Sequence, residues 1–175
     1  MNLQNLMVDS IRESATNVFS TMLGVELSAA ESVVENGTPD SNDGVVSFIG
    51  LAGSWVGTGS VSCSPALACR VCSLMLMTDS TVMDEDVLDA VAELTNMIIG
   101  NVKNDLEAQL GTLGLSLPTV VFGRNFKTKS AGTTEWTVVR FHWEGETLVV
   151  KLCLSPSDKS HSNCHMMGQT CAIDL

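Results

Sequence analysis

The chain has 175 residues, of which 45% are hydrophobic, and a formal net charge of −11. This length is enough for one domain with its own buried core. The acidic charge argues against nucleic acid and anionic membrane surfaces as partners, because both require clustered Lys and Arg. The sequence contains no apolar run of the length that spans a bilayer, so we expect no membrane-spanning helix.

The N-terminal residues and the cysteines exclude two further classes. Residues 1–13 are polar and amphipathic and lack the order of a secretory signal, so we expect a cytoplasmic protein. Cys63, Cys69 and Cys72 lie among apolar residues, which indicates reduced, buried thiols rather than a disulfide or redox site. The Cys and His residues within 161–171 lack the paired spacing of a structural zinc site, so we predict no metal site.

Periodicity and turn residues divide the chain into helices and strands. The predicted helices span 2–23, 65–77 and 84–110, and the predicted strands span 25–35, 45–51, 55–63, 118–124, 134–142 and 146–154. Helices and strands come in blocks joined by short turns. This arrangement favours an α+β fold in which a mostly antiparallel, six-stranded sheet packs against a layer of helices. We expect one domain over 1–156 and a flexible tail over 157–175.

The predicted helix over 84–110 has two unlike faces. At about 100° per residue, one side is apolar and forms ordinary core. The opposite side carries a polar stripe of Asp89, Glu93, Asn96, Gly100, Asn104 and Glu107. From periodicity alone, a solvated helix face remains the simpler explanation of this stripe. Asp105 interrupts the apolar side, which suggests that the last turns of the helix leave the core.

A weak internal repeat links this helix to the first one. The first helix carries Asp9, Glu13 and Thr16 at the same spacing as Asp89, Glu93 and Asn96. We therefore expect two pseudo-repeated halves, of which only the second keeps the pair of a carboxylate and an amide.

The pair of Glu93 and Asn96 could act on a phosphorylated partner. A carboxylate can hold a partner lysine, and an amide both donates and accepts hydrogen bonds, so it can orient a water. Amide-positioned water is used in phosphoryl transfer to aim the attack at phosphorus. Asp89 is equally well placed as an ordinary helix-start acid, and Pro118 is expected to shape the start of a strand.

At these residues the sequence resembles the CheX proteins, within the chemotaxis phosphatases that include CheC and FliY. The family signature is Asp or Ser, three residues, Glu, two residues, Asn, and a Pro somewhat over twenty positions on. Here it reads Asp89, Glu93, Asn96 and Pro118. The resemblance extends to three further stretches: Ala15 to Gly24, Phe48 to Gly50, and Gly57 to Gly59.

The resemblance implies a phosphatase for phosphorylated CheY-type response regulators. Glu93 would engage the active-site lysine of the regulator, and Asn96 would align the water that attacks the aspartyl phosphate. Asp89, Gly100 and Pro118 would bind the partner or support the pair. The Mg²⁺ would belong to the receiver domain, so no cofactor is expected in this chain.

The resemblance also implies a homodimer joined through its sheets. The alternative function is a non-catalytic docking or regulatory module on the same fold that binds a receiver domain or another signalling partner, since a fold does not fix a function.

Overall fold

The computed structural model describes residues 2–36, 40–128 and 135–157. Its helices are α1 (Leu3–Val18), continued by the π-helical turn η1 (Phe19–Leu23), α2 (Pro65–Leu76) and α3 (Glu85–Leu110). Its strands are β1 (Ser28–Asn36), β2 (Asp40–Gly53), β3 (Trp55–Cys63), β4 (Leu113–Leu115), β5 (Thr119–Thr128), β6 (Glu135–Trp143) and β7 (Glu146–Pro156). The predicted α+β fold is confirmed.

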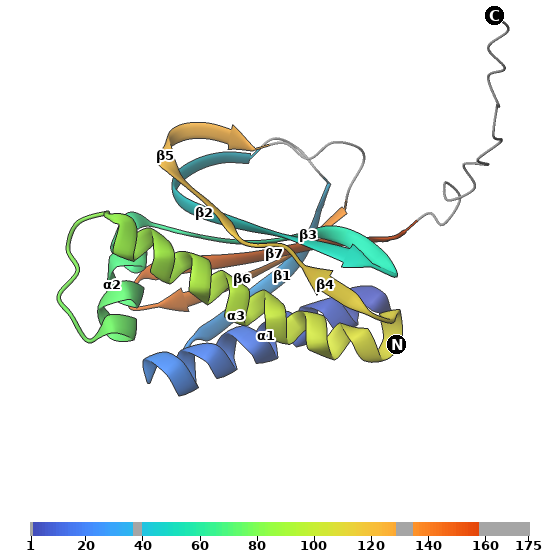
Figure 1. The fold of residues 1–175 in the computed structure, drawn as a ribbon. Helices are drawn as coiled ribbons and strands as arrows, with labels where there is room; N and C mark the ends of the chain where they lie inside the picture. Colours follow the sequence, from blue (N-terminus) through green and yellow to red (C-terminus); the bar gives the residue numbers. More distant parts are fainter. Residues whose placement is uncertain (1, 37–39, 129–134, 158–175) are drawn as a thin grey trace, which may run out of the picture.

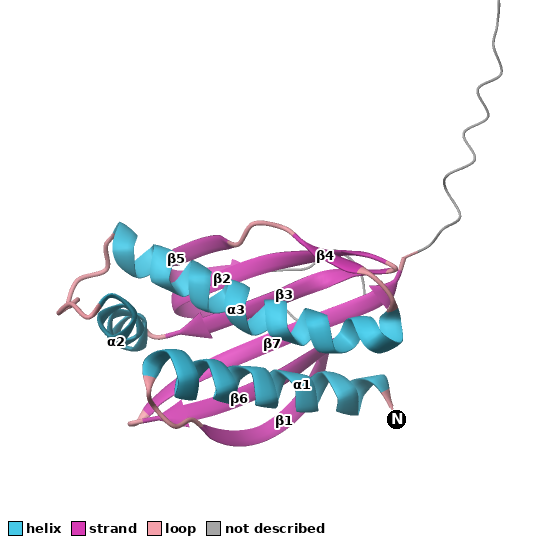
Figure 2. Ribbon diagram, turned by 60° about the horizontal axis from the view of Figure 1, so that its bottom comes forward, coloured by secondary structure: helices cyan, strands magenta, loops and turns pink. Residues whose placement is uncertain are grey.

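One antiparallel sheet forms one layer of the fold, and the helices form a second layer packed against it (Figure 1). The strand order is β1-β6-β7-β3-β2-β4, and β5 also pairs with β2. Helices α1 and α3 lie side by side across the same face of the sheet (Figure 2). The core is the apolar layer between these helices and the sheet, which a 45% hydrophobic chain can fill.

The topology supports the predicted repeat. Exchanging β1 with β5, β2 with β6 and β3 with β7 turns the order β1-β6-β7-β3-β2-β5 into its own reverse. The same exchange brings α1 onto α3, which run antiparallel: Ser14 Oγ donates to the carbonyl of Ile98 at 2.8 Å, and Ser10 Oγ donates to Asp105 at 2.6 Å. Helix α2 and strand β4 have no counterpart among the described elements, so each half is a helix followed by three strands.

The helix boundaries follow the local signals. Gly24 ends η1 in the left-handed conformation at φ 68°, as its place after an apolar helix predicts. The side chain of Ser64 caps α2, and Pro65 occupies the first turn, where its missing N–H costs nothing.

The structure departs from the sequence expectations in three places. The sheet gains a seventh strand, β4, whose three residues are too few to produce a recognisable alternation. Strands β2 and β5 are longer than expected, because they pair beyond a bulge as far as Asp40 and Thr128. The expectation that the last turns of the long helix leave the core is wrong. Leu106 is fully buried, and Asp105 accepts its bond from Ser10 at the contact between α1 and α3.

Two findings bear on the limits of the domain. No helix in the described ranges is both long and apolar enough to cross a bilayer. The expected tail over 157–175 lies outside the described residues from 158 onward, so its boundary stays a prediction.

Candidate functional site

Helix α3 is anchored at both ends. The side chain of Asp84 accepts a hydrogen bond from the backbone N–H of Val87 at 3.0 Å, and Glu85 and Asp86 place negative charge at the positive end of the helix dipole. Gly111 ends the helix. The apolar face is fully buried, at 0% exposure, as predicted for Val87, Val91, Leu94, Ile98 and Val102. The opposite face is therefore presented to solvent on a fixed support.

The first half of the predicted stripe is exposed and unengaged. Asp89, Glu93 and Asn96 are all exposed. Within residues 2–36, 40–128 and 135–157, none of their side chains makes a hydrogen bond or ion pair. Glu93 and Asn96 are three residues apart, so they lie about 4.5 Å apart along the helix axis and on the same side. Both can reach the same partner group.

The second half of the stripe has a structural role. Glu107 binds Lys103 at 3.0 Å, and its Oε1 accepts the backbone N–H of Leu113 at 2.8 Å. The Leu113 bond first, and then the nearby Lys103, hold the pKa of Glu107 below its usual value of 4.5. Asn104 accepts a bond from Lys103 at 3.3 Å. These contacts tie the end of α3 to β4 and leave Glu93 and Asn96 as the free pair.

Gly100 keeps the surface beside Asn96 low. A Cβ atom added there would have only the Cδ1 atom of Leu115 within 4 Å, at 3.9 Å. There is therefore room for a side chain, and the glycine is not required by packing. The half-buried glycine leaves this space unfilled one helical turn after Asn96, beside Leu115.

Pro118 lies at a break in the edge strand beside α3. Leu115 pairs with Leu51 of β2, and Thr119 pairs with Phe48. The edge therefore advances four residues where β2 advances three. One extra residue is therefore inserted between β4 and β5, as in a β-bulge. Proline has no N–H to donate, so it is tolerated at such an edge break. Pro118 thus directly precedes β5, whereas the sequence expectation made it the first residue of that strand.

The incomplete twin of the stripe lies on α1. Glu13 is exposed and Thr16 is half-buried. Glu13 borders a polar groove between α1 and α3 together with Asn17 and Asn101. Asn104, from the second half of the α3 stripe, lines the same groove, whereas Glu93 and Asn96 do not.

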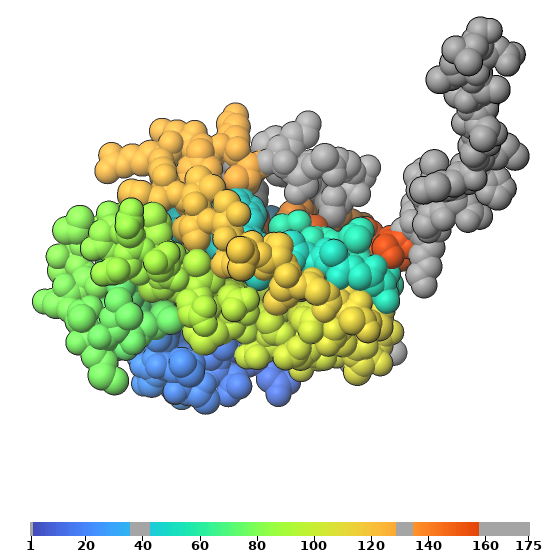
Figure 3. Space-filling view, in the orientation of Figure 1, coloured from blue at the N-terminus to red at the C-terminus, as the bar shows by residue number. Residues whose placement is uncertain are grey.

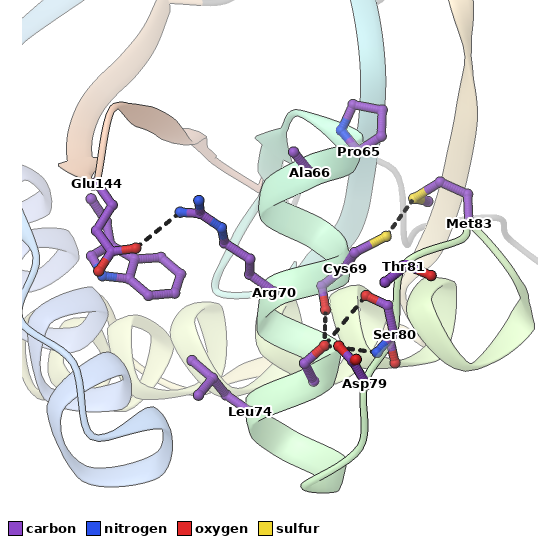
Figure 4. Close-up of a pocket in the computed structure, with 12 residues that line it drawn as sticks. Pro65, Ala66, Cys69, Arg70, Leu74, Asp79, Ser80, Thr81, Met83 and Glu144 are labelled. Atoms are coloured by element: carbon purple, nitrogen blue, oxygen red, sulfur yellow. Dashed lines mark hydrogen bonds and ion pairs between the residues drawn. The ribbon is translucent and has the colours of Figure 1, made fainter.

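A separate pocket lies elsewhere in the described part of the chain (Figure 4). A cavity of about 760 Å³ opens between α2, the connection after it, and the turn between β6 and β7. Arg70 crosses it, bound to Glu144 at 3.1 Å and 5.7 Å from the ring centroid of Trp143. Burial raises the pKa of the Cys69 thiol on its wall. None of the predicted site residues lines this cavity.

Sequence reasoning missed the backbone support beside the stripe. The backbone N–H of Ser116 donates to the carbonyl of Gly50 at 2.9 Å, and Ser116 Oγ accepts the N–H of Gly50 at 2.8 Å. Leu117, the next residue, is 89% exposed. A leucine directly before a proline was the available signal.

In the described part of the chain, no group of three or more Cys, His, Asp or Glu residues could hold a metal ion.

Comparison with known proteins identifies the family. A family model described as chemotaxis phosphatase CheX matches residues 45–142. A CheY-P phosphatase CheX from Thermotoga maritima is 36% identical over 89 residues, which cover 50% of this chain and 57% of that protein. The chain thus matches a little over half the length of this curated relative.

Solved structures extend the likeness to nearly the whole fold. A CheC-like superfamily protein from Shewanella sp. PV-4 has a TM-score of 0.76 and 25% identity, covering 89% of this chain and 99% of that one. A chain in the CheX–CheY–BeF₃–Mg²⁺ complex from Borrelia burgdorferi has a TM-score of 0.66 and 26% identity, covering 85% and 97%. Together with the matching family model over more than half of the sequence, these likenesses show that the chain belongs to the CheX family.

Proposed function

We propose that this protein removes the phosphoryl group from the aspartyl phosphate of a CheY-type response regulator. One observation carries the proposal: Glu93 and Asn96 lie exposed and unengaged, one turn apart, on a capped helix whose opposite face is buried. The name of the Thermotoga relative and the complex of the Borrelia protein with CheY support it.

Glu93 binds the receiver, and Asn96 prepares the attack. The carboxylate of Glu93 accepts a charge-assisted hydrogen bond from the active-site lysine of the receiver. The amide of Asn96 accepts one hydrogen from a water and holds its lone pair toward phosphorus. The water oxygen bonds to phosphorus, the bond from phosphorus to the aspartate oxygen breaks, and the electron pair returns to that carboxylate. Inorganic phosphate and the unphosphorylated receiver are the products.

Charge neutralisation on the receiver side makes this approach feasible. A chain of net charge −11 that presents Glu93 would repel an aspartyl phosphate on its own. The lysine and the Mg²⁺ of the receiver pocket would offset that repulsion. This is why Mg²⁺ is expected in the partner and no cofactor in this chain.

The neighbouring residues have supporting roles in this scheme. Asp89, one turn before Glu93, faces the rim of the receiver pocket. Gly100 leaves a low surface that lets the receiver approach Asn96 closely, since no packing contact otherwise requires a glycine there. Pro118 shapes the edge beside the pair. We further propose a cytoplasmic homodimer as the working form.

The test is the loss of phosphate from a receiver domain loaded with a small phosphodonor. We expect the wild-type protein to accelerate this loss, and Glu93→Ala and Asn96→Ala each to remove at least about 100-fold of the acceleration. Asn104→Ala is the matched control, because Asn104 is an exposed asparagine farther along the same face. Equal rates for wild type, Glu93→Ala and Asn96→Ala would refute the mechanism. Binding of the receiver without acceleration would favour the docking module instead.

A further inference from the structure

The bulge between β4 and β5 holds an exposed leucine beside the candidate site. Leu117 is 89% exposed, although it follows a well-paired strand. Leu117 and Pro118 together stand opposite Ile49 of β2, since Gly50 is opposite Ser116 and Phe48 is opposite Thr119. Ile49 faces the helices and is fully buried. The leucine is therefore on the helix-bearing side of the sheet but is not covered by α3.

Two contacts between the edge strand and α3 fix the position of Leu117 along the helix. Leu113 contacts Glu107, and Leu115 lies at Gly100, so the edge strand runs back toward the start of the helix. A strand advances about 3.3 Å per residue, which carries the chain about 7 Å from Leu115 to Leu117. A helix advances 1.5 Å per residue, so Asn96 lies about 6 Å before Gly100. Leu117 is thus level with Asn96, and Figure 3 shows this edge lying directly against α3.

The backbone that presents this leucine is held in place. Ser116 exchanges two hydrogen bonds with Gly50, at 2.9 and 2.8 Å, and its hydroxyl also bonds the carbonyl of Leu117 at 2.9 Å. Pro118 restricts the preceding residue to an extended conformation. The exposure of Leu117 is therefore built into the edge, and a partner that covers it does not first have to order a loop.

We infer that Leu117 is an apolar docking contact for the phosphorylated receiver domain, on the same surface as Glu93 and Asn96. The inference rests on the proposed function, which names the receiver as occupant. Leu117 lies on the same surface as the Glu93 and Asn96 pair, level with Asn96. A protein that reaches this pair from solvent therefore also meets the leucine. A contact to Leu117 adds affinity that does not depend on charge, which an acidic surface facing a phosphate needs.

Kinetics of the Leu117→Ala variant test the inference. We expect its KM for the phosphorylated receiver to rise about 10-fold, while kcat changes less than about 2-fold, because the contact binds substrate and transition state equally. Leu117→Met should restore most of the affinity. The rise in KM should persist at high salt, whereas contacts of Glu93 weaken there. The control is Leu76→Ala, the same substitution at a half-exposed leucine at the end of α2.

Two kinetic outcomes would overturn the inference, and a binding measurement decides it if the proposed function fails. An unchanged KM for Leu117→Ala, with activity still lost in Glu93→Ala, would reject the docking contact and leave the proposed function standing. A change of oligomeric state in Leu117→Ala, with KM unchanged, would assign the leucine to a second copy of the chain. Absence of acceleration by the wild type would reject the proposed function. Binding of a beryllofluoride-loaded receiver to wild type and Leu117→Ala would then decide the contact, and equal affinities would refute it.

Discussion

Substituting Gly59 with alanine probes how closely β3 packs against α3 beneath the candidate site. A Cβ atom at Gly59 would lie 2.9 Å from Cδ1 and 3.0 Å from both Cγ atoms of Ile99. Carbon atoms pack best at about 3.5–4.0 Å, so the two groups must separate by about 0.5–1 Å. Ile99 is fully buried in the hydrophobic core, so its displacement must be accommodated by neighbouring core side chains. The substitution should therefore lower the free energy of unfolding by about 1–3 kcal/mol.

A double-mutant cycle makes this prediction specific. Ile99→Ala removes all three clashing atoms and should cost about 2–5 kcal/mol by leaving a cavity. In Gly59→Ala/Ile99→Ala the new methyl group occupies part of that cavity, so the combined cost should be about 1–3 kcal/mol less than the sum of the two. Urea unfolding followed by circular dichroism measures all four proteins. Additive costs, or an unaffected Gly59→Ala protein, would refute the packing described for this interface.

Two further predictions concern titratable groups. The pKa of Glu107 is held below 4.5, so its contribution to stability is present above that pH and lost as pH falls through the folded-state pKa. Glu107→Gln should therefore lose less stability between neutral and acidic pH than the wild type, and parallel acid-unfolding curves would contradict this. Burial, together with the nearby Glu146 and Cys69, raises the pKa of Cys63 from 9.0 to about 12, which lowers its thiolate fraction about 1,000-fold. Iodoacetamide should label Cys63 only as fast as the protein unfolds, as measured by peptide mass spectrometry, and rapid labelling of the folded protein would contradict its burial.

The fold could be predicted wherever one local signal governs an element. Helix α3 was predicted to within one residue, because its capping acid, its apolar period and its terminal glycine agree. The short strand β4 could not be predicted, because a Leu-Gly-Leu segment is paired by its tertiary position beside β2 rather than by its own pattern. Asp105 was misjudged for the same reason: its partner is Ser10, ninety-five residues away.

Some residues of the candidate site could be predicted from local spacing, and others depend on tertiary pairing. Glu93 and Asn96 share a helix face, so their spacing alone predicts that they lie together, and the structure exposes both. The family resemblance supplied the chemistry, which a pattern of one acid and one amide leaves open. The place of Leu117 depends on a one-residue mismatch between two strands. Such a register follows from pairing across the sheet, and the proline after Leu117 marks the break without fixing the register.

Single-turnover decay of a phosphorylated receiver at saturating concentrations of this protein tests the central claim most directly. Saturation removes differences in affinity, so the rate reports the chemical step. We expect the wild type to accelerate decay, and Asn96→Ala to return the rate close to that of the receiver alone while still binding a beryllofluoride-loaded receiver. An Asn96→Ala protein that accelerates decay as fast as the wild type would contradict the assignment of Asn96 as the residue that aligns the attacking water.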